Sequence, residues 1–261
     1  PSRIMAGFFI PDPRFEMPEL FEPGRKPVGP VEIGWINTLA KGLDFFYLAG
    51  ELKDLANMYG VERLDLPSSG GSDDGDGTGY LLASNEPTGL TCMISNYTFI
   101  TSTSVSSINC IYGCFNDGFS QGLQMFTNAT FDESVSGGDV YFFLRDSSGN
   151  AFRGGTNGEN LNDGAKHIIT LSIKKLASGT EELKIWADGA SLSVLTGTNT
   201  LGNSATTWDY PPAILGRNSR GTIDNISTAT LDLFMINSGF IFTDEEIKRL
   251  HALPYQLLIP K

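Results

Sequence analysis

The chain has 261 residues, of which 40% are hydrophobic and only 18% are charged. Its 18 Lys and Arg face 30 Asp and Glu, for a net charge of -12. This balance argues against binding to nucleic acid or to anionic membranes, because both depend on basic side chains. No apolar run reaches the roughly 18 to 20 residues of a membrane-spanning helix. We find no export signal either, and expect a soluble chain.

The first thirty residues form a proline-rich segment with an apolar composition. Each proline fixes its own φ angle and removes a hydrogen-bond donor, which disfavours a packed helix or a central strand. The aromatic residues Phe8, Phe9, Phe15 and Phe21 make the segment too apolar to extend into water. We therefore predict an extended arm over residues 1–30, with these four residues as assembly contacts. It would lie either on its own domain or on a neighbouring subunit.

Residues 31–261 are predicted to form the globular domain. Residues 37–42 indicate a turn or short helix, and residues 43–48 indicate a strand rich in aromatic residues. Residues 67–79 have the composition of a flexible loop. Asp73, Asp74 and Asp76 in this loop are candidate calcium ligands, but Asn85 stands where an EF-hand loop starting at Asp74 needs its final Glu. We expect no required cofactor, with calcium binding and a solvated loop left as alternatives.

From Tyr80 onward, strand-like runs alternate with turn clusters, which is typical of a β-sandwich. The runs are residues 97–100, 108–114, 123–126, 140–144, 167–173, 183–186, 213–215 and 230–236. Residues 146–150 and 177–180 have the composition of hairpin turns. Residues 243–253 form the clear helix, because Thr243 and Glu246 make a capping box and Pro254 ends the segment. We expect this helix to close one end of the sandwich.

The three cysteines, Cys92, Cys110 and Cys114, are an odd number. An odd count argues against a domain held together by disulfides. We predict that they are reduced core residues.

Three segments resemble the laminin-G/concanavalin-like family of jelly-roll sandwiches. Residues 163–171 are similar to its "D-G-x-x-H-h-h-x-h" strand, residues 183–189 to its "h-x-h-Y-h-D-G" strand and turn, and residues 231–247 to its closing strand and helix start. The resemblance covers roughly residues 80–253. It implies an all-β fold of two antiparallel sheets, with a hairpin from His167 to Asp188 and a turn at Asp188 and Gly189 that needs positive φ.

The two ends of this region resemble tailed-bacteriophage proteins. Residues 26–43 look like a lead-in found before such sandwiches, and residues 251–258 are similar to an "a-d-P-W-Q-L-f" tail, with Tyr255 in place of Trp. This resemblance implies a structural protein on the exterior of the virion, either a capsid decoration or a head or tail fibre component. Its partners would be other virion proteins and further copies of itself.

Some concanavalin-like relatives are glucanases, which need paired carboxylates on one strand face. The sequence has no E-x-D-x-E pattern, and Asp132 and Glu133 are adjacent, so in a strand they would point to opposite faces. His167 has no nucleophile or acidic partner patterned around it, and we interpret it as structural. We predict no enzymatic activity; the alternative is a glycan hydrolase whose carboxylates come from distant strands.

Sugar binding usually depends on exposed aromatic residues beside polar groups. Trp208, Asp209 and Tyr210 follow a polar stretch and are the candidate carbohydrate-binding residues. The alternative is that Trp208 fills the edge of the sandwich. A carbohydrate-binding adhesin that recognises host surface glycans is therefore the second hypothesis for the function.

Overall fold

The computed structural model describes residues 26–27, 30–49, 55–56, 61–64, 68–69, 72–74, 80–83, 94–102, 109–115, 122–127, 140–145, 150–156, 159, 161–175, 181–196, 213–219, 222–224 and 227–260. The predicted arm contacts Phe8, Phe9, Phe15 and Phe21 lie outside these residues.

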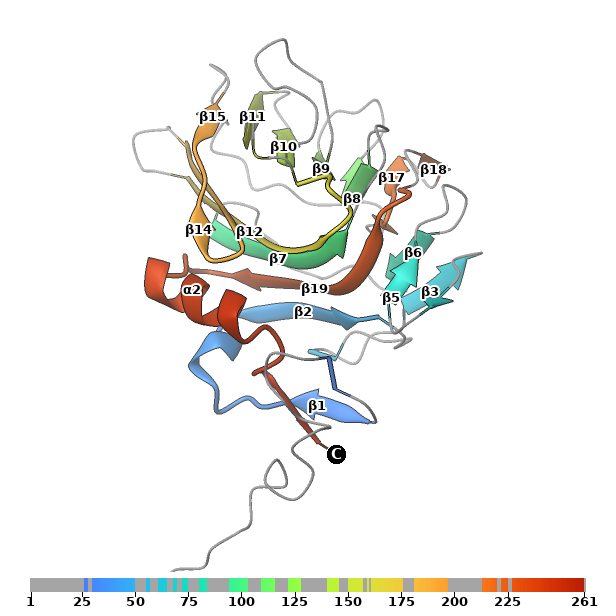
Figure 1. Cartoon of the computed structure of the whole chain (residues 1–261). Helices are drawn as coiled ribbons and strands as arrows, with labels where there is room; N and C mark the ends of the chain where they lie inside the picture. The colour runs from blue at the N-terminus through green and yellow to red at the C-terminus, as the bar shows by residue number, and fades with distance from the viewer. Residues whose placement is uncertain are drawn as a thin grey trace, which may run out of the picture.

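The described residues form two large antiparallel sheets that face each other (Figure 1). The ten-stranded sheet runs in the order β15 (Val194–Thr196), β11 (Ala151–Thr156), β10 (Val140–Arg145), β9 (Gly122–Thr127), β8 (Asn109–Phe115), β16 (Ala213–Ile214), β6 (Tyr80–Ala83) and β3 (Val61–Leu64). In addition, β17 (Arg217–Ser219) pairs with β8, and β18 (Thr222–Asp224) pairs with β17. The eight-stranded sheet runs in the order β14 (Ala190–Ser191), β13 (Glu181–Ala187), β12 (Lys166–Lys175), β7 (Ile94–Ser102), β19 (Thr230–Ser238), β5 (Ser72–Asp74) and β4 (Ser68–Ser69), with β2 (Leu43–Leu48) also paired to β19. The predicted two-sheet sandwich is confirmed.

The predicted hairpin is the pair formed by β12 and β13. Ile169, Leu171 and Ile173 pair with Ala187, Ile185 and Leu183, and all six side chains are buried in the core between the sheets. Alternation places these residues on one face of the hairpin, so the same register that joins the strands also fills the core. The observed register of the two strands therefore agrees with their hydrophobic pattern.

Aromatic rings fill the centre of the core. Phe234 of β19 is fully buried and stacks on Tyr112 of β8 across the sandwich, with ring centroids 4.8 Å apart. Phe45 and Phe99 contact the same ring at 6.1 Å and 6.4 Å. Ring pairs at these separations add to the stabilisation from buried apolar area, so Phe234 ties both sheets together.

A third layer, here called the cap, covers the outer face of the eight-stranded sheet (Figure 1). It consists of the 3-10 helix η2 (Thr38–Ala40), the helix α2 (Asp244–Ala252) and the small sheet of β1 (Val31–Ile33) and β20 (Leu258–Pro260). The expectation that the helix closes one end of the sandwich is wrong. Ile247 and Leu250 pack instead with Phe46, Leu233 and Met235 on this outer face, because the face is apolar and has to be shielded from water.

The cap joins the two ends of the described chain. Gly34 N–H donates to the carbonyl oxygen of Leu257 at 2.7 Å, next to the β1–β20 pairing. The predicted capping box is confirmed, with Thr243 and Glu246 each satisfying the backbone of the other. Gln256 donates to the carbonyl oxygens of Arg249 and Leu253, which ends the helix.

The structure adds strands that the sequence did not predict. β4 and β5 lie in the segment expected to be a flexible loop, where β5 pairs with β19 through Leu231 and Asp73. β11 was also missed, since Gly154 and Gly155 interrupt its strand-like pattern. The described helices are too short to span a membrane.

Candidate functional site

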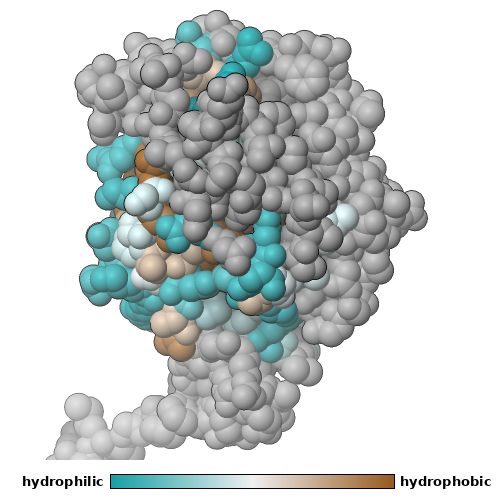
Figure 2. Space-filling model, turned by 45° about the horizontal axis from the view of Figure 1, so that its top comes forward, coloured by the Kyte–Doolittle hydropathy of each residue, from teal (hydrophilic) through white to brown (hydrophobic). Residues whose placement is uncertain are grey.

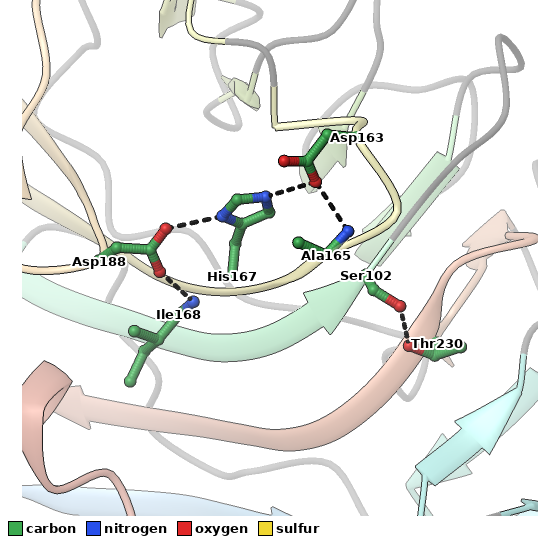
Figure 3. Close-up of polar contacts among 7 residues, drawn as sticks. All are labelled: Ser102, Asp163, Ala165, His167, Ile168, Asp188 and Thr230. Carbon is green, nitrogen blue, oxygen red and sulfur yellow. Dashed lines mark hydrogen bonds and ion pairs between the residues drawn. The ribbon is translucent and has the colours of Figure 1, made fainter.

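His167 lies at the rim of the eight-stranded sheet between two carboxylates (Figure 3). Its Nδ1 is 2.7 Å from Asp188 Oδ2, and its Nε2 is 3.1 Å from Asp163 Oδ1. Asp188 also accepts the N–H of Ile168, and Asp163 accepts the N–H of Ala165. The three side chains therefore fasten the start of β12 to the loop before it and to the turn after β13.

These contacts correct one interpretation of the sequence, which found no acidic partner for His167. The partners come from positions four residues before and 21 residues after it, so only the folded hairpin reveals them. Burial lowers the pKa of His167, but the hydrogen bonds to Asp188 and Asp163 outweigh burial and raise the pKa above its usual value. The backbone N–H of Ala165, followed by His167, lowers the pKa of Asp163.

Because both ring nitrogens face carboxylate oxygens of the protein, neither nitrogen is directed at a substrate as a general base would be. Asp188 and Gly189 have φ angles of 50° and 85°, and Ala187 pairs with Ala190 around them. This geometry is a two-residue turn with positive φ at both positions. The arrangement supports a structural role for His167, namely holding this turn against β12.

His251 of α2 supports the same turn from the cap. Its Nδ1 accepts the N–H of Gly189 at 2.9 Å, and its Nε2 lies 2.8 Å from Thr170 Oγ1. Burial lowers the pKa of His251 to about 4. The ring is thus neutral at pH 7, and its acceptor nitrogen stays available to the turn.

A pocket lies on the outer face of the ten-stranded sheet, which we call the outer-face pocket. Its lining residues are Gln124, Phe126, Tyr141, Phe143 and Arg153, and its volume is about 230 Å³. They come from neighbouring strands: Tyr141 pairs with Phe126, while Phe143 pairs with Gln124 on one side and Arg153 on the other. Their strand neighbours Leu123, Met125 and Phe142 point into the core. Alternation therefore places the five lining residues on the opposite face.

The outer-face pocket combines an aromatic floor with polar groups at one side. Phe126 and Tyr141 are buried, with ring centroids 6.3 Å apart. Phe143 and Arg153 are partly exposed, and the Arg153 guanidinium lies 5.5 Å from the Phe143 ring centroid. A Cβ atom on Gly155, opposite Tyr141, would lie 2.8 Å from the Val140 carbonyl oxygen, so a side chain there would push the two strands apart.

Two other hollows lie on the cap side of the molecule. One of about 500 Å³ is bordered by Trp35 and Ile36, which with Leu253 are the large hydrophobic side chains exposed in the described residues. On the face shown in Figure 2, the described surface is mainly hydrophilic, with hydrophobic atoms visible between polar ones. The other hollow, of about 330 Å³, contains the ion pair of Lys166 with buried Asp232 at 2.6 Å. In the first hollow, Trp35 offers a surface for stacking, but this hollow is shallow and is formed by residues 35–44 alone.

The sequence-predicted site residues are not brought into any described site. Trp208, Asp209, Tyr210 and Asp76 lie outside the described residues. Asp73 and Asp74 belong to β5, and their side chains are not described. Within the described part of the chain, no group of three or more His, Cys, Asp or Glu is placed to hold a metal ion.

Sequence reasoning missed all five lining residues of the outer-face pocket. Arg153 sits in the unpredicted strand β11. A signal was present: a hairpin turn at residues 146–150 after a strand implies a partner strand immediately afterwards. Placing that strand opposite residues 140–145 would have aligned Arg153 with Phe143.

Comparison with protein-family models and with curated proteins found no match. Several solved structures are similar to this chain in their fold. The binding domain of botulinum neurotoxin serotype D aligns over 82% of this chain and 52% of its own, with a TM-score of 0.58 and 13% identity. This chain thus spans about half of that domain.

Two shorter structures are covered almost completely. The CBM40 of Ruminococcus gnavus IT-sialidase, solved with α2,3-sialyllactose, aligns over 69% of this chain and 96% of its own, with a TM-score of 0.51 and 15% identity. Domain 4 of AbnA, a GH43 extracellular arabinanase from Geobacillus stearothermophilus, was solved with arabinotriose. It aligns over 80% of this chain and 98% of its own, with a TM-score of 0.54 and 12% identity. At these identities the comparison shows a shared fold: the chain is a concanavalin-like jelly-roll sandwich that resembles carbohydrate-binding domains.

Proposed function

We propose that the chain is a carbohydrate-binding sandwich and that it holds sugar in the outer-face pocket. The observation that carries this proposal is the combination of an aromatic floor with Gln124 and Arg153 in one concave site. Aromatic rings pack against the apolar faces of sugar rings, while amide and guanidinium groups bind their hydroxyl oxygens. The carbohydrates bound in two of the similar structures support the same function.

The proposal is tested by screening the full chain on a glycan array and then titrating the strongest ligand by calorimetry. Phe143→Ala should weaken binding at least about 5-fold, because it removes the partly exposed ring of the pocket. Trp35→Ala is the matched control, since it removes an exposed aromatic side chain on the cap side and should leave affinity unchanged. Trp208→Ala tests the candidate from the sequence. An array without binding would contradict the function, and loss of binding only in Trp35→Ala or Trp208→Ala would contradict the site.

We further propose that the protein binds its glycan without cleaving it. The support is that both ring nitrogens of His167 lie within hydrogen-bond distance of carboxylates of the protein itself, so this cluster holds the turn after β13. Incubation with laminarin and with any glycan found on the array should release no reducing ends. Turnover that survives His167→Gln would point to carboxylates elsewhere and overturn the non-enzymatic assignment.

We also propose that the protein lies on the exterior of a phage particle. It is supported by the resemblance of the lead-in and the tail to phage proteins; the two segments meet where Ile33 pairs with Leu258 and Gly34 N–H donates to the carbonyl oxygen of Leu257. Labelled antibodies against the chain should bind intact particles in electron micrographs. Particles that bind antibody only after disruption would contradict an exterior position.

A further inference from the structure

The Arg153 guanidinium has a buried nitrogen without a hydrogen-bond partner. Among the described residues, its Nε is one of a few buried side-chain atoms in this state, together with atoms of Tyr97, Thr127, Asn162, Trp186 and Asn237. Within this set, Arg153 is the charged residue, and it is also the residue that lines one of the described pockets. A buried donor of a charged group without an acceptor is costly, so the position favours a ligand that supplies an acceptor.

Phe143 holds the guanidinium in one orientation. The 5.5 Å contact with the ring is a cation–π interaction that occupies a face of the guanidinium and leaves its N–H edge for other partners. A guanidinium edge matches the two oxygens of a carboxylate, which it can bind through two parallel hydrogen bonds. Stacking therefore prepares Arg153 for an anion without satisfying its donors.

The charge around Arg153 also favours an anion. Within the described lining no carboxylate is present, although the whole chain carries 30 Asp and Glu. Arg145 lies two residues beyond Phe143 on β10, so alternation places it on the same face as Arg153. The outer face of β10 and β11 thus carries two arginine side chains on an otherwise acidic protein.

We propose that the outer-face pocket binds a sugar that carries a carboxylate, with Arg153 as the partner of that carboxylate. This inference rests on the proposed function and narrows it to acidic glycans. The partly exposed ring of Phe143 contacts the sugar ring, above the floor formed by Phe126 and Tyr141. The volume of about 230 Å³ suits one sugar unit at the end or in the middle of a chain. Sialic acids and uronic acids both supply this chemistry.

The test compares acidic sugars with neutral counterparts of the same shape. Calorimetry is run with tri-galacturonic acid and with 3′-sialyllactose, each against its own methyl ester. At least one acid should bind about 10- to 100-fold more tightly than its neutral partner. The two pairs distinguish the uronic from the sialic source.

Arg153→Met, which keeps an unbranched apolar stem but removes the guanidinium and its charge, should reduce this preference to about 1-fold. Arg153→Lys should retain part of the preference, because it keeps the charge and loses the paired N–H geometry. If Arg153→Met does not fold, the test is the preference of the wild-type protein for the acid over its neutral partner. This preference should decline as salt is added.

Three results would overturn the inference. Equal affinity for acid and ester, with binding still reduced by Phe143→Ala, would contradict the acidic ligand and leave the proposed function standing. Acid preference unchanged in folded Arg153→Met would place the carboxylate elsewhere. Absence of binding to every probe and to the glycan array would contradict both the inference and the proposed function.

Discussion

The outer faces of the two sheets differ in the contacts that their side chains make. On the eight-stranded sheet, polar side chains bind the cap: Asn96 donates to the Phe240 carbonyl oxygen and accepts the N–H of Phe242, and Asn237 donates to the carbonyl oxygens of Leu39 and Lys41. On β9, β10 and β11, aromatic rings surround a guanidinium whose Nε has no partner among the described residues. The first face is covered by the cap, and the second has the pocket that we propose as the ligand site.

The largest expected effect comes from breaking the cap. Leu250 is fully buried against the eight-stranded sheet, so Leu250→Ala should lower the free energy of unfolding by about 3 kcal/mol. Leu253→Ala, at a more exposed position just after the helix, should cost less than about 0.5 kcal/mol. Urea denaturation measures both. Equal losses in the two variants would show that the cap does not seal this face.

Acid should weaken the cap through His251. Its folded pKa of about 4 lies below its unfolded value of 6.5, so the unfolded state takes up a proton first as the pH falls. The contribution of His251 to the free energy of unfolding is fully present above pH 6.5. It decreases by up to about 3 kcal/mol as the pH falls to about 4. His251→Gln should remove this part of the pH dependence. Parallel stability curves for the variant and the wild type would refute the assignment.

The pH dependence of stability that comes from His167 should have the opposite sign and a smaller size. Its folded pKa is raised, so its stabilisation is complete below pH 6.5 and is lost as the pH rises through the folded pKa. The effect is smaller because Asp163 and Asp188 are about half exposed, and water screens both contacts. Nuclear magnetic resonance titration of the two ring signals measures both pKa values. A His167 pKa below that of His251 would contradict the described contacts.

The smallest effect concerns the outer-face pocket. Arg153→Met should lower the free energy of unfolding by less than about 0.5 kcal/mol, because loss of the cation–π contact with Phe143 is offset by removal of a buried donor that has no acceptor. Lys166→Met removes a cation from a pair with buried Asp232 and should cost about 1 kcal/mol or more. Chemical denaturation of the two variants compares them. A loss in Arg153→Met as large as that in Lys166→Met would mean that Arg153 stabilises the fold rather than awaiting a ligand.

The sequence predicted β12 and β13, whose apolar residues alternate clearly, the continuous apolar run of β19, and the capped helix α2. It did not predict β11, because the two glycines in Ala151–Thr156 remove the side chains on which a strand pattern depends. The position of α2 was also missed, since a helix of this composition fits either an end or a face of the sandwich.

The candidate site could not be predicted from local pattern. Gln124, Tyr141 and Arg153 lie on three strands, and only the register of β9, β10 and β11 brings them together. The same holds for Asp188, whose side chain reaches His167 across 21 residues of sequence. In both cases the chemistry arises from strand pairing, which composition and spacing do not specify.

The most direct test of the account is a titration of the isotope-labelled chain with its strongest array ligand, followed by amide chemical shifts. We expect the largest changes at residues 122–127, 140–145 and 151–156, with little change at the cap residues 244–260. Changes concentrated at residues 34–44, at residues 208–210 or in the cap would contradict the claim that the outer face of the ten-stranded sheet is the glycan-binding face.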